Sequence, residues 1–108
     1  MIKSAGRVLF VKTNEIDWIE AADYYACLHV GTKSHLVRRS LADLEQDLEP
    51  STFCRIHRST IVNLERVRGL EANADGEPEI VLDNGEHLRF SRRYRKVLQE
   101  KLGMTEQV

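Results

Sequence analysis

Short apolar runs, rich in valine, isoleucine and aromatic side chains, recur along almost the whole chain between turn residues. Runs of this composition predict β-strands. The chain is therefore predicted to be mainly β. The expected strands are Arg7–Thr13, Ile16–Glu20, Tyr24–Val30, Ser34–Arg39, Phe53–His57, Ser59–Asn63, Val67–Asn73, Pro78–Leu82 and His87–Phe90.

Turn residues between these runs predict hairpins. Gly31 follows one run directly and is expected in the turn to the next. Asp83-Asn84-Gly85 is the strongest turn signal, because Asn-Gly tolerates the positive φ angles of a type I′ turn.

Two segments have helical periodicity. Ser40 is a candidate N-cap with Asp43 at the N3 position, close to a capping box, and Pro50 ends this short helix. Ser91 is expected to cap a final helix over Arg92–Leu102. The residues expected to share one helical face are Leu41, Leu44 and Leu48 in the first helix, and Tyr94, Val97, Leu98 and Leu102 in the second.

The composition indicates one domain over residues 1–108, since 108 residues of which 42% are hydrophobic can form a single core. Lys and Arg number 16 against 17 Asp and Glu, so the net charge is -1 and a uniformly basic polyanion binder is excluded. The sequence has no signal peptide and no apolar run long enough to span a bilayer. We therefore expect a cytoplasmic protein without membrane contact, in which Cys27 and Cys54 are reduced and buried.

Charges are segregated along the chain. Residues 55–68 hold four basic residues and one acid, and residues 89–101 hold six basic residues and one acid. Asp43–Glu49 holds four acids, and Glu71–Glu86 holds six, with no basic residue in either. This pattern favours one positive and one negative face. The alternatives are an ordinary solvated surface and a protein-interaction module that uses the acidic segments.

The start of the last helix favours an anion site. A helix N-terminus carries partial positive charge, yet Arg92, Arg93 and Arg95 occupy the expected first turn. Each such charge costs about 0.3–1 kcal/mol at an exposed site, which an arriving phosphate would offset. The alternative is that Glu86 or another acid neutralises the cluster in the fold.

The stretch "HRST" lies where two strand-like runs meet. Arg58 and Ser59 are therefore expected to project from a strand end or loop, within reach of a phosphate or a base edge. Arg55 and His57 alternate with Ile56, so we expect them to share a face opposite the core. For His57, support of the loop is as plausible as a contact with DNA.

No enzyme, cofactor or metal site is predicted. The four histidines form no HExxH motif and no Cys/His ligand spacing. His29 and His35 could face each other across the Gly31 hairpin, but two ligands make a poor zinc site. A nuclease that uses His57 with the arginines has no metal-binding carboxylate cluster to support it.

Four segments together resemble the LytTR-type DNA-binding domain, and the resemblance covers Arg7 to Leu102. "FCRIHRSTIVNLERV" is similar to its signature, Phe-x-Arg-Ile-His-Arg-Ser-x-x-Val-Asn. The other segments are "IDWIEAADYYACLHV", similar to its upstream strand pair, "VRRSLADLEQDL", similar to its helix, and "LDNGEHLRFSRRYRKVLQEKL", similar to its closing hairpin and helix.

The resemblance implies an elongated fold of several short antiparallel sheets and two short helices. Such domains insert loops into successive major grooves, bend the duplex and bind paired direct repeats in bacterial promoters, usually behind a receiver domain. The chain holds no receiver domain, which leaves an excised module, a stand-alone regulator and a homodimer on DNA all open. The implied DNA-binding residues are Asp23, Tyr24, Arg38, Arg58, Ser59, Arg92, Arg93, Tyr94 and Lys96, with His57 and Asn63 as loop supports.

Two positions depart from the family pattern. Thr60 stands where an aromatic residue is common, and Tyr24 replaces a residue that is often smaller and polar. The base preference of the loop that the resemblance places around Asp23 and Tyr24 therefore does not follow from it.

Overall fold

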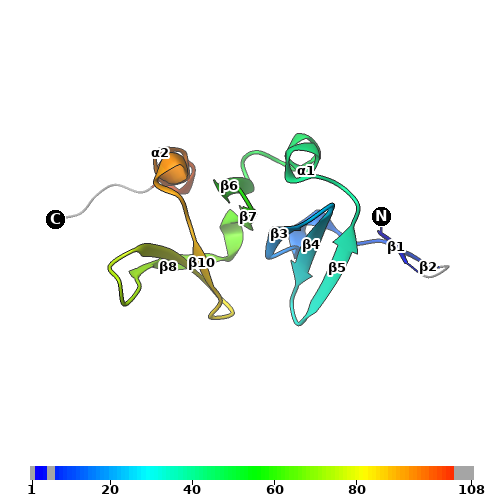
Figure 1. The fold of residues 1–108 in the computed structure, drawn as a ribbon, viewed down its shortest axis with the longest axis horizontal. Helices are drawn as coiled ribbons and strands as arrows, with labels where there is room; N and C mark the ends of the chain where they lie inside the picture. The colour runs from blue at the N-terminus through cyan, green and yellow to red at the C-terminus, as the bar shows by residue number, and fades with distance from the viewer. Residues whose placement is uncertain (1, 5–6, 104–108) are drawn as a thin grey trace.

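The computed structural model describes residues 2–4 and 7–103, whose strands form three antiparallel sheets. The molecule is elongated, with extents of 54, 27 and 23 Å (Figure 1). The mainly β architecture with two short helices confirms the predicted fold class. In the described part of the chain, neither helix has the length and apolar character needed to cross a membrane.

The largest sheet has five strands in the order β5-β4-β3-β7-β6. Gly31, with φ of 60°, lies in the predicted turn between β4 and β5, where Val30 pairs with Lys33. The strands are β3 (Trp18–Ala22), β4 (Tyr25–Val30), β5 (Lys33–Val37), β6 (Phe53–His57) and β7 (Thr60–Asn63).

Helix α1 (Leu41–Asp47) packs on one face of this sheet. Ser40 Oγ accepts a hydrogen bond from the Asp43 backbone N–H at 3.1 Å, which confirms the predicted N-cap. Leu41, Leu44 and Leu48 are buried against the sheet, as their spacing predicts. The helix ends at Asp47, before Pro50 is reached.

A three-stranded sheet and the last helix enclose a second core on the other side of β6 and β7 (Figure 1). The elements are β8 (Val67–Ala72), β9 (Pro78–Leu82), β10 (His87–Arg89), the 3-10 helix η3 (Arg92–Tyr94) and α2 (Arg95–Leu102). The remaining elements are β1 (Ile2–Ser4), β2 (Arg7–Leu9) and the 3-10 helices η1 (Thr13–Glu15) and η2 (Leu64–Arg66).

Strands β6 and β7 belong to both cores. Phe53 and Ile61 are buried in the core beneath α1, whereas Cys54 and Val62 are buried in the second core. Alternate side chains of a strand point to opposite faces, so this strand pair has no solvent-facing side over these residues. The two halves of the elongated molecule are therefore joined through a shared, buried hairpin.

Two local predictions were wrong. The expected strand Arg7–Thr13 ends at Leu9 and is followed by η1. Asn84 lacks the positive φ of a type I′ turn: the Gly85 N–H bonds to Leu82 O at 2.9 Å, and Gly85 alone has φ of 89°. This matches a three-residue hairpin loop with glycine in the left-handed region.

The predicted last helix is divided. Its first residues form η3, and the α-helix begins only at Arg95. Leu98 is fully buried as expected, but Val97 is 45% exposed and lies outside the core. Only a narrow stripe of α2 therefore faces β6 and the second core.

Candidate nucleic-acid interface

The β3–β4 turn carries two of the predicted DNA-binding residues at its tip. Ala22 pairs with Tyr25, so Asp23 and Tyr24 form the whole turn. Asp23 has φ of 57° and is the sole non-glycine residue with positive φ within residues 2–4 and 7–103. Aspartate tolerates this conformation better than most residues. Tyr24 is 82% exposed, so its ring is free to contact a partner.

The β6–β7 loop, with Arg58 and Ser59, lies beside that turn. Ser59 O accepts a hydrogen bond from the Ala21 backbone N–H at 2.9 Å. Arg58 is exposed, as predicted. The two loops, separated by more than thirty residues in sequence, thus occupy the same end of the five-stranded sheet.

His57 holds the β6–β7 loop through Ser59. Its Nδ1 lies 2.8 Å from Ser59 Oγ and accepts a hydrogen bond from the Ser59 backbone N–H at 3.1 Å. Because a backbone N–H donates to Nδ1, a neutral His57 ring carries its hydrogen on Nε2. The Ser59 hydroxyl also lies 3.5 Å from Thr60 Oγ1, so it has two polar neighbours within the chain.

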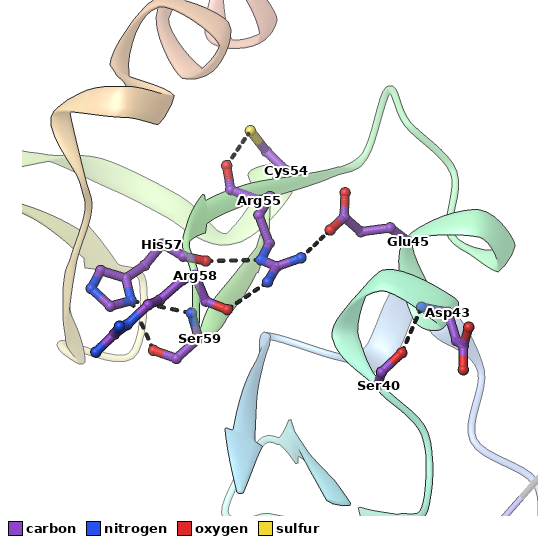
Figure 2. Close-up of polar contacts among 8 residues, drawn as sticks. All are labelled: Ser40, Asp43, Glu45, Cys54, Arg55, His57, Arg58 and Ser59. Carbon is purple, nitrogen blue, oxygen red and sulfur yellow. Dashed lines mark hydrogen bonds and ion pairs between the residues drawn. The ribbon is translucent and has the colours of Figure 1, made fainter. Parts of the chain in front are cut away.

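The prediction that Arg55 and His57 share a face was wrong. A bulge interrupts the β6–β7 register at Ile56, so that Arg55 pairs with Ile61 and His57 pairs with Thr60. Consecutive residues of β7 point to opposite faces. The extra residue therefore directs Arg55 toward α1 and His57 toward the other face, as Figure 2 shows.

Arg55 supports this loop, a role that no signal in the sequence indicates. Its Nε donates to His57 O at 2.9 Å and its Nη2 donates to Arg58 O at 2.5 Å. Its Nη1 forms an ion pair with Glu45 of α1 (Figure 2). One planar guanidinium thus fixes the backbone on both sides of the Arg58 side chain and anchors it to a helix.

Arg55→Lys is expected to loosen this loop. A lysine ammonium is a point charge and cannot reproduce the planar fork, so we expect a loss of about 1–3 kcal/mol in the free energy of unfolding. Denaturant unfolding measures the effect. Arg39→Lys is the matched control, since Arg39 pairs with Asp47 of the same helix at a more exposed site. If Arg55→Lys and Arg39→Lys both lower the free energy of unfolding by the same small amount, the Arg55 contacts do not stabilise the loop.

Helix η3 carries Arg92 and Arg93, two more of the predicted DNA-binding residues, and is joined to β6. The Ser91 backbone N–H donates to Ile56 O of β6 at 2.8 Å, and Ser91 Oγ accepts from the Arg93 N–H at 3.4 Å. Arg92 and Arg93 are exposed, and neither η3 nor the first turn of α2 contains an acid. The Arg93 guanidinium lies 5.5 Å from the centre of the Tyr94 ring.

Of the remaining residues predicted to bind DNA or support a loop, two are exposed and one is fully buried. Lys96 is exposed in α2, and Arg38 is exposed directly after Val37, which pairs with Ala26 at the end of the sheet that carries the Tyr24 turn. Asn63 is fully buried at the other end of β7. Its side chain donates to Ile16 O at 2.8 Å and accepts from the Glu65 N–H at 2.9 Å, so it supports the start of η2 and not the Arg58 loop.

Ion pairing separates the basic residues into two classes. Arg55 and Arg66 are neutralised by Glu45 and Asp17. By contrast, Arg58, Arg92 and Arg93 form no ion pair with any acid in the described part of the chain, and Glu86 does not compensate them. Arg38, Arg68, Arg89 and Arg95 also form no ion pair among the described residues, so the unpaired arginines include those at the sheet end and at η3 but are not confined to them.

His29 and His35 do not face each other across the hairpin. His29 pairs with Ser34, and His35 pairs with Leu28, so the two imidazoles project from opposite faces of the hairpin. The two-residue turn at Gly31 sets this register.

The two thiols differ in exposure. Cys54 is buried as predicted, and burial raises the pKa of its thiol, with Lys101 opposing the rise and Glu45 adding to it. Cys27 is only partly buried, contrary to expectation. Because a raised pKa lowers the thiolate fraction, we expect a small alkylating reagent to modify Cys27 at least about tenfold faster than Cys54. Peptide mass spectrometry over time measures both rates, and equal rates would contradict the burial of Cys54.

Known proteins match this chain over almost its whole length. Residues 6–103 match the family model described as the LytTr DNA-binding domain. An uncharacterized response regulatory protein of Yersinia pestis is 33% identical over 99 residues, which are 91% of this chain and 40% of that protein. The sensory transduction protein LytT of Enterococcus faecalis is 25% identical over 104 residues, 96% of this chain and 43% of that protein.

The fold also matches a solved structure. The LytTr DNA-binding domain of a putative methyl-accepting/DNA response regulator from Bacillus cereus has a TM-score of 0.82 and 24% sequence identity. The match covers 95% of this chain and 94% of that one. The present chain spans about two fifths of the length of the two relatives above.

Proposed function

Because this chain belongs to the family of LytTR DNA-binding domains, we propose that it binds double-stranded DNA sequence-specifically within a bacterial transcription regulator. The observation that carries the proposal is the convergence of three exposed elements from distant segments. The Asp23–Tyr24 turn, the Arg58 loop and η3 are connected by backbone hydrogen bonds from Ala21 to Ser59 and from Ser91 to Ile56.

The proposed roles follow from the chemistry of the side chains. Arg58 and Arg93 read base edges, since arginine matches the O6 and N7 atoms of guanine with two hydrogen bonds. Arg92, Lys96 and Arg38 contact phosphates, and Tyr94 supports them. Asp23, Tyr24 and Ser59 contribute hydrogen-bonding groups near the bases.

On this proposal the loops enter successive major grooves and bend the duplex. Paired direct repeats in a promoter would each hold one copy of the domain, which allows a homodimer on DNA. The relatives are more than twice as long as this chain, and two of them are named as regulatory or sensory transduction proteins. We therefore propose that a receiver domain controls this domain in the full-length cytoplasmic protein.

Affinity is expected to fall steeply with salt, despite the net charge of -1. The local arginines, and not the whole protein, meet the phosphates and release their counterions. For about six phosphate contacts, affinity should fall about a thousandfold between roughly 50 and 200 mM salt. A fluorescence-anisotropy titration of a promoter-length duplex measures this fall. A flat response over that range would rule out a phosphate-binding surface of this kind.

A protein-interaction module that uses the acidic segments is the alternative. Several of those acids already have partners within the chain: Asp47 pairs with Arg39, Glu45 with Arg55, and Glu79 lies 3.6 Å from His87. These pairs reduce the negative charge available to another protein. This alternative would be favoured if the chain does not bind duplex DNA, or if its affinity for duplex DNA does not change with salt.

A further inference from the structure

A cluster of three metal-binding side chains lies on β3 and β4, outside the proposed DNA surface. Glu20 pairs directly with Cys27, and His29 follows on the same strand and the same face. One donor atom from each residue lies within 4.8 Å of the other two. The antiparallel register of β3 and β4 brings these three residues together. The cluster therefore cannot be found from ligand spacing along the chain.

We propose that Glu20, Cys27 and His29 bind a divalent transition-metal ion of the zinc class. A thiolate, an imidazole and a carboxylate are the ligand types that zinc takes in proteins, and three of them leave a fourth tetrahedral position for water. All three residues are partly exposed, so both the ion and the water have access.

The geometry requires only small adjustments. Ligand atoms about 2.0–2.3 Å from a tetrahedral zinc ion are about 3.3–3.6 Å apart. His29 Nε2 and Glu20 Oε1 are 2.9 Å apart, so this pair opens slightly when an ion enters, while the sulfur of Cys27 moves inward. As the ion binds, the Cys27 thiol loses its proton to solvent, and the neutral His29 ring exchanges the Nε2 hydrogen that it donates to Glu20 for one on Nδ1, so that Nε2 is free to bind the metal.

The imidazole is held in place before any ion arrives. Its ring stacks on Trp18 with ring centres 4.0 Å apart and an interplanar angle of 6°. Trp18 is the one tryptophan of the chain. Groups that fix a histidine ligand commonly change metal affinity by about 10–100-fold. A bound ion would cross-link β3 to β4, the hairpin that carries the Asp23–Tyr24 turn.

Cobalt(II) titration of the metal-free protein tests the proposal. We expect a sulfur-to-cobalt charge-transfer band in the near ultraviolet that saturates at one ion per chain. Cys27→Ser should remove the band, and Glu20→Gln and His29→Ala should each weaken binding at least about tenfold. His35→Ala is the control, because His35 lies on the opposite face of the hairpin, and it should leave the band unchanged.

Two measurements on the unaltered chain keep the test independent of how variants fold. Saturating zinc should raise the Tm by at least about 4 °C, since binding to the folded state stabilises it. Zinc should also protect Cys27, but not Cys54, from alkylation. Absence of the charge-transfer band, its persistence in Cys27→Ser, or unprotected Cys27 at saturating zinc would each overturn the proposal. None of these results depends on whether the chain binds DNA.

Discussion

Replacing Arg92 and Arg93 together with glutamate is expected to abolish DNA binding while raising the Tm. Both side chains are exposed, and η3 and the first turn of α2 hold no acid that compensates them. In the free protein each arginine therefore opposes the dipole of the turn that leads into α2. Glutamate reverses this term and should stabilise the fold by up to about 1 kcal/mol per site, less about 0.5–1 kcal/mol for the lost contact between Arg93 and the Tyr94 ring.

The same change places two acids against the phosphate backbone, so stability and binding should move in opposite directions. A thermal melt and a duplex titration on one protein sample measure both. Lys12→Glu with Lys33→Glu changes the net charge equally. Lys33 adjoins the Gly31 turn, at the sheet end opposite Tyr24, so this control should retain binding. A double arginine variant that melts below the parent protein would show that these arginines have structural partners.

Arg58→Ala is expected to cost about 1–3 kcal/mol of specific binding, or roughly 5–150-fold in Kd. Arg58 is exposed and unpaired among the described residues, while Arg55, His57 and Ser59 fix its backbone. The unfolding free energy should therefore change by less than about 0.5 kcal/mol. If Arg58 reads a base, the variant should lose affinity only for duplexes that carry the preferred base at the one or two positions that Arg58 contacts. Duplexes with another base there should bind the variant and the parent protein about equally.

The test measures the affinity of the parent protein and of Arg58→Ala for a panel of duplexes, each with one altered base pair. Lys33→Ala is the matched control, because it removes a basic side chain from the opposite end of the sheet. A loss that is uniform across the panel would make Arg58 a phosphate contact. An unchanged affinity would remove the β6–β7 loop from the proposed interface.

Local chemistry made most of the fold predictable from the sequence. Runs rich in β-branched and aromatic residues marked the strands of the two larger sheets, Ser40 marked the start of α1, and Gly31 marked a hairpin turn. These signals depend on residues close together in sequence, so a single chain reveals them. The order of strands within the sheets came only with the structure.

The departures arise where pairing between strands decides the outcome. The bulge at Ile56 carries no glycine or proline signal, yet it separates Arg55 from His57 and directs Arg55 to Glu45. The Glu20–Cys27 pair likewise follows from the register of β3 against β4. Such contacts depend on tertiary packing, which sequence periodicity does not encode.

Selection of bound duplexes from a random pool tests the central claim most directly, because it assumes no operator. If the three elements enter successive major grooves, the unaltered chain should enrich a defined motif. Its preferred bases should form blocks whose centres are about 10–10.5 base pairs apart. The same selection with Arg58→Ala should lose preference in one block and keep it in the remaining blocks. A pool that shows no enriched motif after selection with the unaltered chain would contradict the account.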